Sequence, residues 1–155
     1  MKKIKVCICQ PDKENMKSFN ETISSIDVNQ FELFLGLVGP MDNLINSLDL
    51  QEDGLNKITI LDQNSDNYDD FKAYIFSPNG LSYLRSFFKT MEMIEKNHSS
   101  VDIVVLYPKD YWVKFIEWVK EKNKDDNIMF KSVNCIELTN DIKEAFNIIK
   151  RKYYG

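Results

Sequence analysis

Two carboxylates stand where a parallel sheet binds ligands. Asp62 directly follows the apolar run 57–61, and Asp12 closely follows the run 3–9, with Asn64 just beyond Asp62. Ligands of open parallel sheets bind outside the carboxyl ends of the strands. Oxygen ligands suit Mg²⁺, and a carboxylate beside a metal can accept a phosphoryl group. We therefore predict Asp12, Asp62 and Asn64 as Mg²⁺ ligands and Asp62 as a phosphoacceptor. The alternative is that Asp12 only caps a helix and Asp62 only ends a strand.

The segment after Asp62 also allows a calcium interpretation. Four side chains fall at positions one, three, five and nine of an EF-hand-like loop: Asp62, Asn64, Asp66 and Asp70. Position six is Asn67 where the turn requires Gly, and position twelve is Ala73 where a bidentate Glu belongs. A solvated acidic surface loop is therefore the favoured interpretation of this segment.

Composition excludes several classes of protein. The net charge of −4 disfavours a nucleic-acid binder, which needs a basic face. No apolar run is long enough to cross a membrane, so we expect no membrane insertion. The three cysteines show no pairing pattern, which favours a reducing cytoplasm, and we expect Cys7 and Cys9 in the first strand to be buried thiols. No phosphate-binding glycine loop and no hydrolase triad is present.

The elements that must position these residues alternate along the chain. Five runs are typical of buried strands: 3–9, 31–38, 57–61, 101–107 and 128–138. Helical spacing begins at Asp12, spans 41–48 and 81–97, and begins again at Asp110 and at Thr139 or Asn140. This alternation predicts a three-layer, doubly wound α/β fold of flavodoxin-like type, with a five-stranded, mostly parallel sheet. We expect one domain over 1–155, with 63–79 as an irregular insertion.

Aromatic residues crowd the helix that begins at Asp110. Trp112 and Phe115 fit its apolar core stripe, whereas Tyr111 and Trp118 fall at the border. Trp and Tyr are enriched at interface hot spots. These four residues are therefore a predicted interaction face, formed with the last helix and the strand between. The alternative is that they only widen the buried stripe.

The order and spacing of the elements resemble the receiver domains of bacterial response regulators. Residues 58–62 (Ile-Thr-Ile-Leu-Asp) resemble the strand that ends in the phosphorylated Asp, and 80–85 (Gly-Leu-Ser-Tyr-Leu-Arg) resemble the following helix start. The acidic pair of receivers is replaced by 10–11 (Gln-Pro), the hydroxyl residue by Tyr107 and the Lys by Leu138. The resemblance therefore implies an atypical receiver-like module without an ordinary phosphorylation switch.

A second resemblance concerns the same strand. Residues 57–66 look like the nucleotide-binding strand and turn of inverting nucleotide-sugar glycosyltransferases. This resemblance implies a degenerate or truncated transferase that would use Asp62 and Asp66, with only Asp110 matching its metal-binding motif. The favoured hypothesis is a non-enzymatic signalling or scaffolding module. It needs no cofactor beyond Mg²⁺ at the strand ends, and it binds a protein partner or a second copy of itself.

Overall fold

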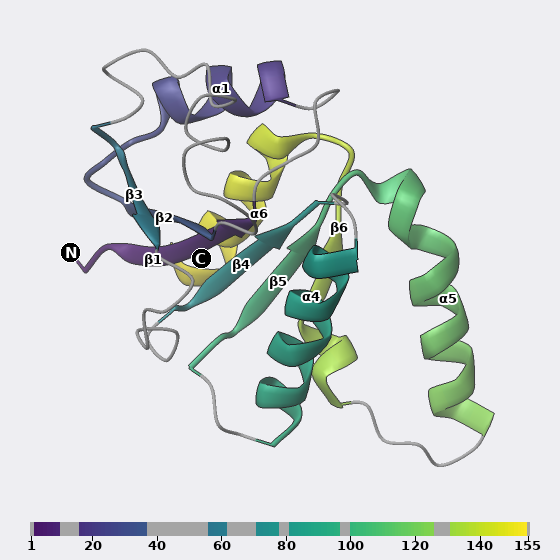
Figure 1. Cartoon of the computed structure of the whole chain (residues 1–155). Coiled ribbons are helices and arrows are strands. Elements are labelled where there is room, and N and C mark those ends of the chain that lie inside the picture. Colours follow the sequence, from purple (N-terminus) through teal and green to yellow (C-terminus); the bar gives the residue numbers. More distant parts are fainter. Residues whose placement is uncertain are drawn as a thin grey trace.

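The structure, a computed structural model, describes residues 2–9, 16–36, 56–61, 71–77, 81–96, 100–125 and 131–154. Figure 1 shows their strands and helices. In chain order they are β1 (Ile4–Cys9), α1 (Met16–Ser25), β2 (Phe31–Gly36), β3 (Ile58–Leu61), β4 (Ala73–Phe76), α4 (Leu81–Glu95), β5 (Ile103–Leu106), α5 (Lys109–Asp125), the 3₁₀-helix η3 (Lys131–Cys135), β6 (Ile136–Leu138) and α6 (Ile142–Tyr154). The helix predicted over 41–48 lies outside these residues, and β2, β3 and β4 follow one another without a described helix between them. None of the described helices is long and apolar enough to span a membrane.

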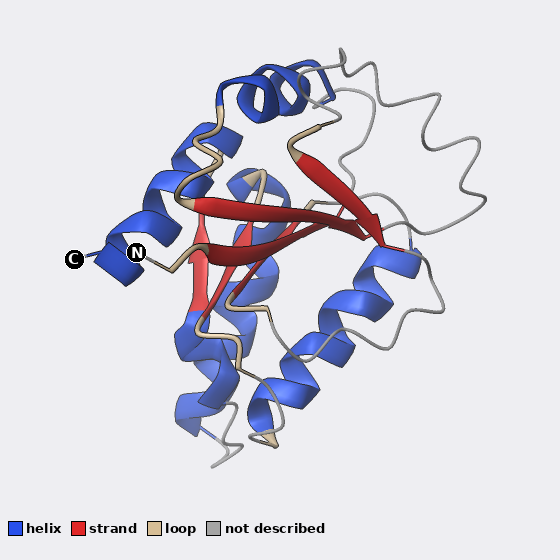
Figure 2. Cartoon of the chain, turned by 90° about the vertical axis from the view of Figure 1, so that its left-hand side faces the viewer, coloured by secondary structure: helices blue, strands red, loops and turns tan. Residues whose placement is uncertain are grey.

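The six strands form one parallel sheet in the order β3-β2-β1-β4-β5-β6. β1 is central: its Val6 is in register with Leu33 of β2 on one side and Ala73 of β4 on the other. Figure 2 shows helices on both sides of the sheet. Side chains of α1 and α6 join the core on one face, and those of α4 and α5 join the core on the other. The predicted three-layer, doubly wound α/β fold is confirmed.

The described residues form six strands of the sheet where the sequence predicted five. The additional strand, β4, lies inside the segment that we expected to be an irregular insertion, and all four of its residues are buried. Its apolar run Ala-Tyr-Ile-Phe is only four residues long and follows an acidic, polar stretch. A run this short has too little periodicity to identify its structure. These residues form a strand because they pair with both β1 and β5 in the folded sheet, and a local sequence pattern does not contain that information.

The place of β4 changes how the sheet compares with receiver domains. Without β3, the strands run β2-β1-β4-β5-β6, which is the 2-1-3-4-5 order of flavodoxins and receivers. β4 therefore occupies the central place that belongs to the phosphoacceptor strand, and it is followed by Ser77. β3, the strand before Asp62, is an extra strand at the sheet edge. The strand order does not support the correspondence between β3 and the acceptor strand.

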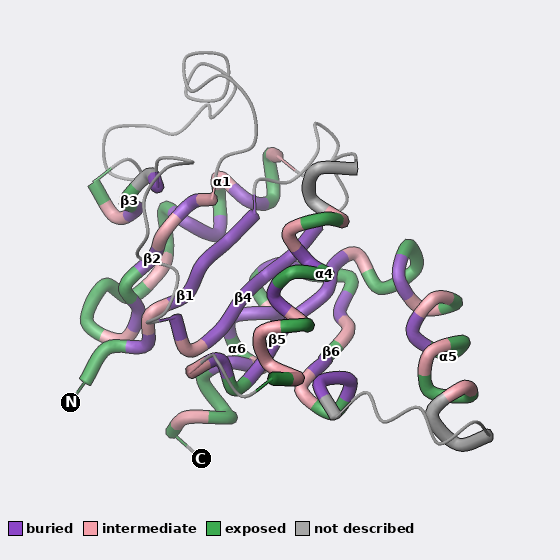
Figure 3. The backbone as a smooth tube through the Cα atoms, turned by 60° about the horizontal axis from the view of Figure 1, so that its bottom comes forward, coloured by how far each residue is buried: buried purple, intermediate pink, exposed green. Residues whose placement is uncertain are grey.

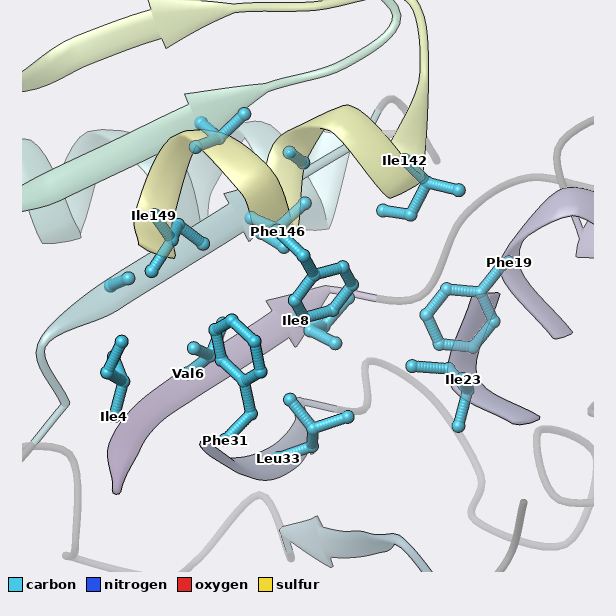
Figure 4. Close-up of a cluster of buried hydrophobic side chains, with 14 of the residues drawn as sticks. Ile4, Val6, Ile8, Phe19, Ile23, Phe31, Leu33, Ile142, Phe146 and Ile149 are labelled. Atoms are coloured by element: carbon cyan, nitrogen blue, oxygen red, sulfur yellow. The ribbon is translucent and has the colours of Figure 1, made fainter. Parts of the chain in front are cut away.

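Alternating side chains of β1 contribute to two cores. Val6 and Ile8 face α1 and α6, where Phe19 of α1 and Phe146 of α6 are also buried (Figure 4). Cys7 faces α4 and α5, because successive side chains of a strand point to opposite faces. Its thiol is fully buried, and this desolvation raises its pKa to about 12. The predicted burial of this cysteine is confirmed, as is that of Cys9.

The last strand and the helix ends differ from the predictions. Of the described part of the predicted strand region 128–138, Ile136–Leu138 pair with β5, and the residues from 131 to 135 form η3 instead. Asp141, rather than Thr139 or Asn140, caps α6: its Oδ1 accepts the Lys143 N–H at 2.9 Å. Asp110 was the predicted cap of α5 but lies within its first turn. The Asp110 N–H donates to Oδ1 of Asn140 at 3.2 Å, so the loop after β6 caps α5 from outside.

Candidate functional site

The predicted strand-end site falls on residues that the structure does not describe. Asp12, Asp62 and Asn64 lie outside the described residues, and so does Asp66 of the nucleotide interpretation. Their roles as metal ligands, phosphoacceptor or nucleotide contacts therefore stay predictions.

The described residues at the same edge bond to one another across the sheet. Ser77 after β4 directs its Oγ at the carbonyl oxygen of Cys9, 3.5 Å away. The Tyr107 N–H donates to the Phe76 carbonyl at 3.0 Å, and the Thr139 N–H donates to the Leu106 carbonyl at 3.1 Å. These contacts hold the ends of the parallel strands together.

The second candidate site, the interaction face predicted on α5, lies within the described residues. The large apolar side chains that the described residues expose are Val28, Phe88, Tyr111, Trp118 and Tyr154. Three of them lie on α4 and α5, and each is about half exposed: Phe88 at 51%, Tyr111 at 54% and Trp118 at 56%. Figure 3 shows exposed positions along both helices. We call Phe88, Tyr111 and Trp118 the aromatic face.

The structure divides the four predicted face residues into two groups. Tyr111 and Trp118 are exposed, as their place at the border of the stripe suggested. Trp112 is only 2% exposed, and its indole N–H donates to the Tyr107 carbonyl at 3.3 Å. Phe115 is half-buried. Trp112 is therefore a core residue rather than part of the face, because it lies on the side of α5 that turns toward the sheet.

A cluster of aromatic rings supports the face from beneath. Phe87 of α4 is buried, and its ring centroid lies 5.6 Å from that of Phe76 on β4 and 5.2 Å from that of Trp112 on α5. It also contacts Phe88 at 5.3 Å and Phe115 at 6.4 Å. Tilted and edge-to-face contacts of this kind are favourable beyond simple burial. The cluster fixes α4 and α5 to the sheet and to each other.

Beside this cluster, α4 and α5 line a groove of about 600 Å³, and Phe87, Phe88 and Phe115 of the cluster form part of its wall. Its apolar lining comes from both helices, η3 and β6: Phe87, Phe88, Met91, Phe115, Ile116, Trp118, Val119, Val133 and Ile136. Oε2 of Glu95 accepts the Ser132 N–H at 2.8 Å, which fixes η3 to the end of α4. Sequence reasoning missed the groove, because it depends on η3 where a strand was expected.

Four charged residues also line the groove: Glu92, Glu95, Lys96 and Lys122. Glu92 of α4 and Lys96, the residue that follows this helix, form an ion pair at 2.5 Å, and the hydrogen bond from Lys96 lowers the pKa of Glu92. Lys122 of α5 is half-buried. No ion pair found between described residues involves Lys122.

Comparison of the chain with protein-family models and with curated proteins finds no match. The site must therefore be interpreted from its own geometry. That geometry offers contact surface: half-exposed aromatic rings on a rigid support, beside an apolar groove with a mixed-charge rim.

Proposed function

We propose that this chain is a receiver-like signalling or scaffolding module that acts by protein–protein contact, and that its partner is a second copy of itself. The aromatic face carries the proposal. Exposed Tyr and Trp side chains on a rigid support are the kind of residues that dominate interface energies. The three free cysteines favour a cytoplasmic location, because thiols persist in a reducing compartment.

The outer surface of α5 has the pattern of a contact helix. Tyr111, Lys114, Trp118 and Glu121 follow one another at spacings of three, four and three, which places them on one side of the helix. All four are exposed. We call them the outer stripe. Its two aromatic residues lie about 10 Å apart along the helix, and their contact with a partner would remove apolar surface from water.

The order of charges along the outer stripe favours a second copy. Lys114 and Glu121 lie equally far from the midpoint between residues 117 and 118. Two α5 helices that pack antiparallel about a two-fold axis there would bring Lys114 of each copy opposite Glu121 of the other. A two-fold contact makes the same pair twice. No ion pair found between described residues engages either side chain within one copy.

Charge reversal tests this arrangement. Lys114→Glu places two carboxylates opposite each other at both ends of the contact, so we expect the dimer dissociation constant to rise about tenfold. Glu121→Lys acts in the same direction. The double variant Lys114→Glu/Glu121→Lys restores opposite charges, and its dissociation constant should return to that of the wild type. Sedimentation equilibrium at low ionic strength measures all four proteins, because salt screens exposed pairs.

Lys150→Glu is the matched control, because it makes the same change in net charge at an exposed position of α6. It should leave association unchanged. The proposal is wrong if the wild type stays monomeric over the whole concentration range, or if the double variant associates no better than the single ones.

A further inference from the structure

The groove between α4 and α5 carries a second inference. Its lining shares Trp118 with the outer stripe, leaves out Tyr111, Lys114 and Glu121, and includes Lys122. We propose that the groove binds an elongated monocarboxylic acid of the acyl-chain class, with the apolar chain between the helices and the carboxylate at Lys122.

The dimensions of the groove suit a slender ligand. Along α4 and the residue after it the lining runs from Phe87 to Lys96, and on α5 it runs from Phe115 to Lys122. At a rise of 1.5 Å per residue, these distances are about 14 Å and about 10 Å. A volume of about 600 Å³ lies within the range of small-molecule sites in proteins. The groove is therefore long enough for an extended chain and large enough for a whole small ligand.

The apolar lining of the groove favours a ligand with an apolar body. The floor is formed by Val133 of η3 and Ile136 of β6, both buried, and the walls include Met91 and Val119, both half-buried. Flexible methionine adapts to the shape of a bound chain. No described polar side chain other than those of Ser132 and the four charged residues lines the groove. A polar ligand body would lose its water without gaining partners.

The charged residues at one end of the groove favour a ligand with a carboxylate head group. α4 and α5 each follow a strand of the same parallel sheet, so they run in the same direction. Lys96 and Lys122 therefore lie at the same end. Lys96 is paired with Glu92, and the Glu95 carboxylate accepts the Ser132 N–H. Lys122 provides the ammonium group for a ligand carboxylate, and a charged hydrogen bond there is stronger than a neutral one.

Three ligands that share one chain and differ in head group test the proposal. Dodecanoate, dodecanol and dodecylammonium are titrated below their aggregation concentrations. Calorimetry measures binding for every variant. In the protein with Met91, a change in tryptophan fluorescence that Trp118→Phe removes places the ligand at the groove wall, because the other tryptophan, Trp112, is buried in the core. We expect dodecanoate to bind about tenfold more tightly than either of the others. Lys122→Met should remove this preference, and Met91→Trp, which fills the groove, should weaken all three ligands.

Two outcomes would overturn the inference. One is equal affinity for dodecanol and dodecanoate, which would remove the role of Lys122. The other is dodecanoate binding that Met91→Trp leaves unchanged while circular dichroism shows the variant folded. The double variant Lys114→Glu/Glu121→Lys should bind dodecanoate like the wild type. Failure of the ligand proposal therefore appears separately from failure of the dimer.

Discussion

We expect Phe87→Ala to lower the free energy of unfolding by about 3–5 kcal/mol, the usual cost of truncating a buried Phe. Phe87 is 2% exposed and connects three elements through its ring contacts with Phe76 on β4, Trp112 on α5 and Phe115. Removing the ring leaves a cavity between α4 and the sheet that these neighbours cannot fill without moving.

Thermal and urea unfolding measure this loss, and the melting temperature should fall by roughly 10 °C. Phe88→Ala is the matched control, since it is the same substitution one residue later on a half-exposed side chain. It should cost roughly 1 kcal/mol or less. An equal decrease in the free energy of unfolding for the two variants would contradict the assignment of Phe87 to the core and of Phe88 to the surface.

Trp118→Ala should weaken self-association about 30-fold or more, because an interface Trp hot spot contributes at least about 2 kcal/mol. Trp118 is 56% exposed and lies beside the midpoint of the proposed two-fold contact, so both copies lose a ring at the centre. Sedimentation equilibrium gives the dissociation constant. The same variant should unfold at nearly the temperature of the wild type, since the exposed ring contributes little to the monomer core.

Val28→Ala controls for the loss of an exposed apolar side chain elsewhere. Val28 is also among the exposed apolar residues, and it lies in the turn before β2. Its truncation should leave association unchanged. Association that survives Trp118→Ala, or that Val28→Ala weakens as strongly, would show that α5 is not the contact helix.

Much of the fold could be predicted because its signals are local. The apolar runs at β1, β2 and β5 are long enough to identify as strands, and the stripes of α1, α5 and α6 repeat over several turns. β4 could not be found in this way, since four apolar residues fit a strand, a loop or part of a helix. Strand order is not encoded in periodicity at all. That is why residues 58–62 could resemble the phosphoacceptor strand of receivers although β3 lies at the sheet edge.

The candidate site was predictable only in part. The angular positions of Tyr111 and Trp118 at the border of the α5 stripe marked them as surface residues, and both are exposed. Phe88 shared the apolar stripe of α4 in the sequence pattern, yet it faces solvent beside the groove. The groove depends on the distance between two helices and on the path of η3, which no spacing of residue types within one helix specifies.

The most direct test of the central claim is a photo-crosslink from the outer stripe. Tyr111→benzoylphenylalanine places a photoreactive ring on α5, and mass spectrometry of the irradiated protein maps the residues it joins. The account predicts that dimer-specific adducts join α5 to α5 of the second copy. Adducts that map to α1 or α6, or a self-associated protein that gives no α5 adduct, would contradict it.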